Sequence, residues 1–194
     1  MKSFRIPAAF AAALLVAPVA VGAPAPKPAQ DQQAQKAADS KDYGTWTVRC
    51  TQAAKSQPPC QMMQVRFVEK TKQRVLGVWL VYMPSQDVNY MEIAVPLGVE
   101  LQNGLVLNTD TYKSGVLKFT RCDAAGCYVG GTIGKEIVDS LGRATKATVQ
   151  VIMVNGKRYN FTLQMDGFSE AHKALVEQTK QKGGGAPAPA AAQP

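Results

Sequence analysis

Histidine is nearly absent from this 194-residue sequence, which contains only His172. A Ser-His-Asp or Cys-His catalytic arrangement would have to use that residue, and no nucleophile-elbow sequence accompanies it. Residues 130–134 are glycine-rich but lack the Lys-Ser/Thr pair of a phosphate-binding loop, and we expect them to bend the chain from a strand into a helix. The acidic residues are scattered, and nothing converges two of them into a glycosidase-type pair. The sequence predicts neither an enzyme nor a cofactor, and an unrecognised hydrolase is only an alternative hypothesis.

Cysteine is also scarce, and the pattern typical of thioredoxin-like redox sites, Cys-x-x-Cys, does not occur. The four cysteines are separated by nine and by four residues within the two local pairs, whereas zinc knuckles favour two intervening residues. Residues 122–127 read as a turn between two strands, which would bring its end residues within the ~7 Å Cα separation that a disulfide needs. We predict two structural disulfides and no metal: Cys50 with Cys60, and Cys122 with Cys127.

No apolar run after the N-terminal segment reaches the ~18 residues of a membrane helix. The N-terminus itself has a basic start with Lys2 and Arg5, an apolar run over 6–21, and then small residues. This pattern predicts a secretory signal peptide over 1–23, cleaved within 20–25. Because no cysteine lies near that site, lipoprotein processing is excluded. The prediction is an exported protein that has no transmembrane helix after cleavage.

Acidic residues are outnumbered by basic ones, 14 to 22, which gives a formal charge of +8. Two of these charges belong to the predicted signal peptide. A moderately basic protein is attracted to anionic surfaces, and the charge alone does not indicate nucleic acid. Basic side chains gather around a predicted hairpin tip, where they are either solvated strand ends or a docking patch for an anionic glycan, a lipid or a protein partner. The predicted partner-binding residues are Arg66, Lys70, Lys72 and Arg74.

Large apolar side chains are missing from both flanks of the chain. Residues 24–41 hold Pro, Ala, Gln and charged residues, with no aromatic or large aliphatic side chain, and 182–194 are mostly Gly, Ala and Pro. Such segments bury too little apolar area to offset their chain entropy. We expect a flexible tether over 24–41, a disordered tail over 182–194, and one folded unit over 42–181.

Alternating apolar residues predict several short strands within this unit. The run 75–83 is nearly continuous and predicts a strand buried on both faces. Asn155-Gly156 separates two alternating segments and predicts a hairpin with a type I′ turn, while Asn103-Gly104 marks a second turn. The other expected strands cover about 46–49, 63–67, 91–95, 105–107, 116–119, 149–153 and 159–163.

Two segments have helical character. Residues 135–141 end at Gly142, and 169–182 could be capped by Ser169 and end before Gly183. His172 lies on what reads as an ordinary amphipathic face. Together with the strands, these segments predict a mainly β sandwich or partial barrel with a short helix and a C-terminal helix.

An ordered set of short motifs spans residues 42–178 and resembles the invasion-associated locus B family. The set consists of Tyr43-Gly44-x-Trp46-x-Val48-x-Cys50, Cys60, Pro96-Leu97-Gly98-Val99, Gly104-Leu105-x-Leu107, Arg121-Cys122-x-x-x-Gly126-Cys127 and Gly167-Phe168-x-x-Ala171.

The resemblance implies an exported domain of Gram-negative bacteria with an immunoglobulin-like β-sandwich and the two disulfides named above. Founding members of the family are linked to invasion of host cells and are associated with the outer membrane or released, although many relatives occur in bacteria that invade nothing. The family has no established catalytic residues. The expectation is a non-enzymatic protein of the periplasm, the outer membrane or the medium that binds a partner in host-cell or surface interaction. The alternative is a periplasmic envelope-integrity or chaperone-like accessory factor.

Overall fold

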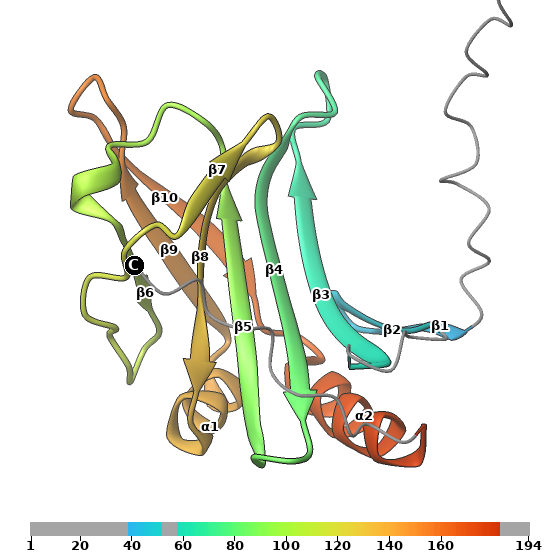
Figure 1. Cartoon of the computed structure of the whole chain (residues 1–194). Helices are drawn as coiled ribbons and strands as arrows, with labels where there is room; N and C mark the ends of the chain where they lie inside the picture. Colours follow the sequence, from blue (N-terminus) through green and yellow to red (C-terminus); the bar gives the residue numbers. More distant parts are fainter. Residues whose placement is uncertain (1–38, 52–57, 183–194) are drawn as a thin grey trace, which may run out of the picture. The chain divides into compact units, whose positions relative to one another are not determined.

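The computed structural model describes residues 39–51 and 58–182, which form two antiparallel sheets and two α-helices (Figure 1). The predicted signal peptide, the tether up to residue 38 and the tail from residue 183 lie outside the described residues. Residues 39–41, at the end of the predicted tether, pair with the next strand. The predicted two-layer, mainly β fold with a short and a C-terminal helix is confirmed.

The larger sheet has seven strands, and all of its neighbouring strands run antiparallel. In spatial order they are β1 (Asp39–Tyr43), β2 (Trp46–Cys50), β3 (Cys60–Phe67), β4 (Arg74–Met83), β5 (Val88–Val95), β8 (Gly126–Ile133) and β7 (Arg121–Asp123).

The second layer has three strands, and in Figure 1 β5 and β8 of the larger sheet pass in front of two of them. A 3₁₀ turn, η1 (Leu101–Asn103), precedes this sheet, and two helices contact each other, one of which packs against the larger sheet. The elements of this layer are β10 (Arg158–Gln164), β9 (Lys146–Ile152), β6 (Leu105–Asn108), α1 (Lys135–Arg143) and α2 (Phe168–Gln181).

The core lies between the layers because apolar residues alternate along the strands with a period of two. Along β2 and β3 the burial pattern alternates, with Trp46, Val48 and Met62 almost completely inaccessible. From α2, Phe168 packs edge-on against Trp46, with ring centroids 5.1 Å apart, and α2 contacts β1 to β4. One face of the large sheet, the inner face, therefore carries the core, and the alternate residues form its outer face.

Side chains of β2 and β3 form hydrogen bonds to the backbone of β10 and so join the two sheets. Gln64 donates from Nε2 to the Gln164 carbonyl at 2.8 Å and accepts the Gln164 N–H at 3.1 Å, so it pairs with the edge of β10 as a backbone strand would. The indole of Trp46 donates to the same carbonyl at 3.0 Å. These hydrogen bonds satisfy polar groups that would otherwise be buried without partners at the seam between the sheets.

Both predicted disulfides are present. Cys50–Cys60 joins directly paired residues of β2 and β3, and Cys122–Cys127 joins paired residues of β7 and β8. The first is almost fully buried on the inner face, whereas Cys122 is exposed at the edge of the sheet.

The predicted Asn155-Gly156 hairpin joins β9 to β10, but its turn is not type I′. Only Gly156 has a positive φ, of 76°, and its N–H donates to the Met153 carbonyl at 2.8 Å. A type I turn followed by a left-handed glycine explains both observations. The Asn155 side chain instead accepts the Lys157 N–H at 3.0 Å, which holds the longer loop.

Two other local expectations are wrong, and two are right only in part. Residues 116–119 form no strand, although Leu117 makes an isolated bridge to Leu105. Ser169 does not cap α2: its hydroxyl donates to the Gly142 carbonyl of α1, and Gly167 precedes the helix. Residues 130 and 131 lie within β8, and the predicted change from strand to helix takes place only at Gly134, between β8 and α1. β4 is buried throughout its inner face, whereas Val75, Trp79 and Val81 on its outer face are only half-buried.

Candidate functional site: the outer face of the seven-stranded sheet

The strand register places polar and aromatic side chains in rows across the outer face. Glu92 of β5 is paired with Trp79 of β4, and Tyr90 is paired with Val81. Arg49 of β2 is paired with Gln61 of β3. Because antiparallel partners project to the same side of a sheet, these residues share one surface. All six residues of these pairs are half-buried, which distinguishes them from their inaccessible neighbours on the inner face.

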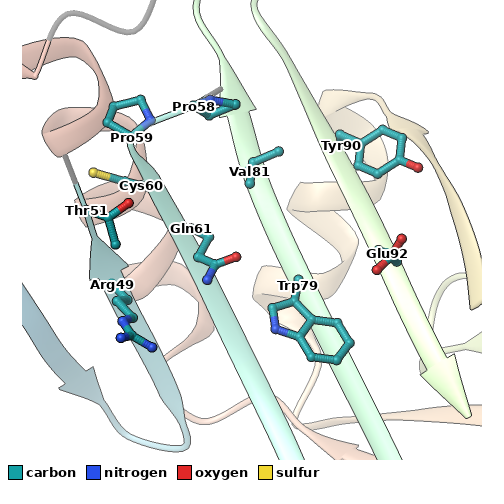
Figure 2. Close-up of a pocket in the computed structure, with 10 residues that line it drawn as sticks. All are labelled: Arg49, Thr51, Pro58, Pro59, Cys60, Gln61, Trp79, Val81, Tyr90 and Glu92. Carbon is teal, nitrogen blue, oxygen red and sulfur yellow. The ribbon is translucent and has the colours of Figure 1, made fainter. Parts of the chain in front are cut away.

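Two aromatic rings lie flat on this surface because glycine occupies the position beneath each. The Trp79 indole covers Gly77, two residues earlier in β4, and a Cβ at Gly77 would collide with the ring. Tyr90 of β5 covers Gly130 of β8 in the same way. Figure 2 shows both rings with a broad face turned outward. A ring seated in this way exposes its π-face instead of burying it.

A groove of about 550 Å³ runs across these strands. Its floor holds Trp79, Val81 and Tyr90, and its wall near the Cys50–Cys60 disulfide holds Pro58 and Pro59 (Figure 2). The remaining lining residues are Arg49, Thr51, Cys60, Gln61 and Glu92. The groove therefore combines apolar platforms with hydrogen-bonding groups, which is the composition of a ligand site.

Arg49 is the basic residue that lines the groove. Among the described residues, no acidic side chain forms an ion pair with it. Its side chain is half-buried, and its Nε is fully buried with no hydrogen-bond partner in that part of the chain. An unpaired buried donor on a charged group costs free energy. A ligand that accepts from this guanidinium would remove that cost.

The opposite end of the face holds a stack of guanidinium groups and rings. The Arg121 guanidinium lies 3.5 Å from the Tyr128 ring centroid, and the Arg74 guanidinium lies 5.6 Å from that centroid and 5.4 Å from the Trp79 ring. Arg121 also bonds Glu92 at 3.1 Å and Asp123 at 3.0 Å. Glu92 is thus neutralised, and cation–π contacts hold the side of the groove next to Trp79.

Burial raises the pKa of the Tyr90 phenol, and the nearby carboxylate of Glu92 adds to this effect. The shift is away from neutral pH, so Tyr90 is protonated there, as an ordinary tyrosine is, and its hydroxyl can donate or accept a hydrogen bond.

The structure does not gather the four predicted partner-binding residues into one patch. Lys70 and Lys72 are exposed in the turn between β3 and β4. Arg66 reaches toward β10, with 3.4 Å between its Nη1 and the Thr162 carbonyl. Arg74 turns onto the outer face, where it donates to the Ala125 carbonyl and to the Tyr128 hydroxyl. Only the two lysines share the hairpin tip, and a role for the tip stays a prediction.

The outer face was not predicted from the sequence, because the nearly continuous apolar run 75–83 reads as a strand buried on both faces. Two signals in the sequence could have revealed it: Gly77 stands two residues before Trp79, and glycine also recurs in β8 at Gly130. Glycine beside an aromatic residue on one face of a strand indicates that the ring lies down on the backbone.

His172 is held as a structural residue. Its Nε2 lies 2.9 Å from the Asn89 amide oxygen, and its ring stacks on Phe168 with centroids 6.2 Å apart. Burial lowers the pKa of the imidazole from 6.5, against a smaller opposing effect of Asp139. No serine or cysteine nucleophile is hydrogen-bonded to it in the part of the chain that the structure describes.

A second, smaller cavity of about 110 Å³ lies between the layers, lined mainly by apolar residues of β5, β6 and β8. Within residues 39–51 and 58–182, no group of three or more His, Cys, Asp or Glu side chains could hold a metal ion. Over the same ranges, no helix has the length and hydropathy needed to span a membrane.

Comparison with known proteins identifies the fold and the family. The family model described as Invasion associated locus B (IalB) protein matches residues 46–176. The crystal structure of invasion associated protein b from Bartonella henselae matches with a TM-score of 0.64 and 22% identity, over 73% of this chain and 98% of that chain. At this identity the match shows the fold alone, and it agrees with the immunoglobulin-like β-sandwich that the family resemblance implied. No curated protein matches significantly.

Proposed function

The chain belongs to the invasion associated locus B family, and on that premise we propose that it is a non-enzymatic, exported protein that binds a partner at a cell surface. The outer face of the seven-stranded sheet is the binding surface. The observation that carries this proposal is the pair of flat rings, Trp79 and Tyr90, which remain half-exposed beside an unpaired Arg49. Aromatic residues and arginine are the side chains enriched at the centres of protein interfaces.

Export is supported by the N-terminal pattern and by the two disulfides, because disulfides persist in oxidising compartments. A non-enzymatic role is supported by the engagement of His172 with Asn89 and Phe168. Both features fit a protein that acts by contact outside the cytoplasm.

Retention of the purified protein on host cells and on isolated bacterial envelopes tests the proposal. We expect the double variant Arg49→Gln/Trp79→Ala to lose at least about tenfold in retention, because it removes one guanidinium and one aromatic platform. The matched control is Lys70→Gln/Lys72→Gln, which removes charge from the hairpin tip and leaves the face intact. Unchanged retention of the outer-face variant at an unchanged Tm would refute the proposal.

Location separates surface interaction from the alternative periplasmic role. With a tag at the C-terminus, protease sensitivity on intact cells or recovery from the medium is the result expected for a protein that contacts host cells or other surfaces. Protein that is degraded only after the outer membrane is broken would overturn that part of the proposal. The outer face would then serve an envelope-integrity or chaperone-like factor.

A further inference from the structure

The orientation of the two rings selects the kind of ligand that fits the groove. Trp79 and Tyr90 lie flat on the sheet, above Gly77 and Gly130, and present broad faces (Figure 2). Grooves that bind polyproline peptides use aromatic side chains to form slots between them. A flat ring instead suits a flat, rigid partner whose apolar side can stack on it while its polar groups point sideways. A sugar ring has this form, because its C–H groups gather on one side and its hydroxyls project around the rim.

Hydrogen-bonding groups surround the platforms at the level of such a rim. Gln61 and Arg49 are directly paired on β3 and β2, and Figure 2 shows Gln61 on the strand next to Trp79 and Arg49 one strand farther away. Gln61 can donate and accept, and Arg49 can donate. From β2 to β5 the groove crosses three strand spacings, about 14 Å, which fits an oligosaccharide better than a single sugar.

The charges on the face select an acidic ligand. Arg49 has no carboxylate partner among the described residues, and its Nε is buried and unpaired. Arg74, beside Trp79, bonds only uncharged groups in that part of the chain, the Ala125 carbonyl and the Tyr128 hydroxyl. Glu92 is already paired with Arg121. Because Arg121 also pairs with Asp123, three guanidinium groups on this face stand against two carboxylates, and the net charge is positive. A carboxylate can accept two parallel N–H groups from one guanidinium.

We propose that this groove binds an oligosaccharide that carries uronic acids, with one sugar ring stacked on Trp79 and a carboxylate paired with Arg49. Tyr90 provides a second platform farther along the chain of sugars, and Gln61 of β3 bonds hydroxyls between Trp79 on β4 and Arg49 on β2. This inference rests on the proposed function and names the chemistry of its partner.

Calorimetric titration of the purified protein with hexagalacturonate tests the inference, with the fully methyl-esterified hexasaccharide as the matched neutral probe. We expect the acid to bind at least about tenfold more tightly than the ester, with an affinity that falls as salt rises. Arg49→Gln should remove the difference between acid and ester, whereas Trp79→Ala should weaken both by about tenfold or more. The Lys70→Gln/Lys72→Gln control should bind the acid as the wild type does.

Tryptophan fluorescence provides a second readout that does not depend on affinity. The chain has two tryptophans, and Trp46 is fully buried, so a saccharide that shields the protein from acrylamide quenching must cover Trp79. Trp79→Phe should keep a platform and hence binding, but lose the protected signal. Equal quenching with and without saturating hexagalacturonate would place the sugar elsewhere and overturn the inference.

The remaining outcomes separate the inference from the proposed function. Equal binding of acid and ester, loss of binding only in the hairpin-tip control, or no saccharide binding would each overturn the inference. If no saccharide binds but Arg49→Gln/Trp79→Ala still abolishes retention on cells, the proposed function stands with another class of partner. Binding of an Ala-Pro decapeptide in place of the saccharide would identify that class as a proline-rich peptide.

Discussion

The two faces of the seven-stranded sheet are built from alternate residues of the same strands, yet they differ in almost every physical property. On the inner face Trp46 is completely buried, packs against Phe168 and donates its indole N–H to a backbone carbonyl. On the outer face Trp79 lies flat over a glycine and keeps one side toward solvent. The inner face stabilises the fold by burying apolar area. The aromatic side chains of the outer face remain partly exposed, and a binding role explains why they are there.

Truncation of each tryptophan to alanine should give the largest difference in stability between the two faces. Trp46→Ala removes a fully buried ring and a satisfied hydrogen bond, so we expect a loss of about 3–5 kcal/mol in the free energy of unfolding. Trp79→Ala should cost less than half as much, because its ring is only half-buried. Urea denaturation of both variants measures the difference, and equal losses would show that the outer face also belongs to the core.

The two disulfides extend the comparison to the edge of the sheet. Chain entropy assigns roughly 3 kcal/mol to the Cys50–Cys60 loop and roughly 2 kcal/mol to the shorter Cys122–Cys127 loop. We expect paired Cys→Ala variants to lose stability in that order. Mild reductant followed by thiol alkylation and mass spectrometry should label Cys122 first, because it is exposed while Cys50 and Cys60 are buried. Earlier labelling of the buried pair would contradict this account.

A pH titration tests the environment of His172 at the inner side of the fold. Because burial places the folded-state pKa of His172 below its ordinary value of 6.5, the folded protein binds fewer protons than the unfolded chain between the two values. Its contribution to the free energy of unfolding is complete above about pH 6.5 and is lost as the pH falls through the folded-state pKa, by at most about 1.4 kcal/mol per pH unit.

His172→Gln should flatten that part of the profile of unfolding free energy against pH. The bond to Lys135 holds the pKa of the facing Asp139 below 3.8, so this carboxyl titrates at lower pH and does not mask the effect. An unchanged slope in His172→Gln would show that another group titrates there.

Substitution of two adjacent glycines of β8 compares the two faces with the smallest expected effect and the most closely matched pair of variants. Gly131 points to the inner side, where an added Cβ meets nothing within 4 Å, so Gly131→Ala should stabilise the protein by about 0.5–1 kcal/mol through the unfolded chain. At Gly130 an added Cβ would displace the Tyr90 ring from its seat. The unfolding temperature should therefore rise only in Gly131→Ala. Retention on cells should fall only in Gly130→Ala.

The sequence predicted the inner face better than the outer one, for a physical reason. Burial imposes a period of two, and the alternation around Trp46 located the first inner-face strand, while the spacing of the cysteines indicated which strands lie side by side. The alternation of Met63 and Val65 located β3 but belongs to its outer face, because Met62 is the buried residue. The outer face depends on pairing between strands that are distant in sequence. Tyr90 of β5 and Gly130 of β8 meet only through register, which a single sequence does not reveal.

The basic cluster shows the same limit. Spacing in the sequence put Arg74 with Lys70 and Lys72, but the ring of Tyr128, contributed by β8, draws its guanidinium onto the outer face. Long side chains at the ends of strands are oriented by tertiary contacts that the local pattern does not contain. Similarly, Asn155-Gly156 located the hairpin, while the loop length and the side chain of Asn155 determined the type of turn.

Hydroxyl-radical footprinting of the protein, free and bound to the cells or envelopes that retain it, tests the central claim most directly, because it locates the contact without identifying the partner. The outer-face hypothesis predicts that binding lowers the oxidation of Trp79, Tyr90 and Met63, which is paired with Trp79, while oxidation of the exposed Tyr159 on β10 does not change. Protection of Phe67 and Val68 at the β3–β4 turn, with Trp79 unchanged, would contradict it and assign binding to the hairpin tip.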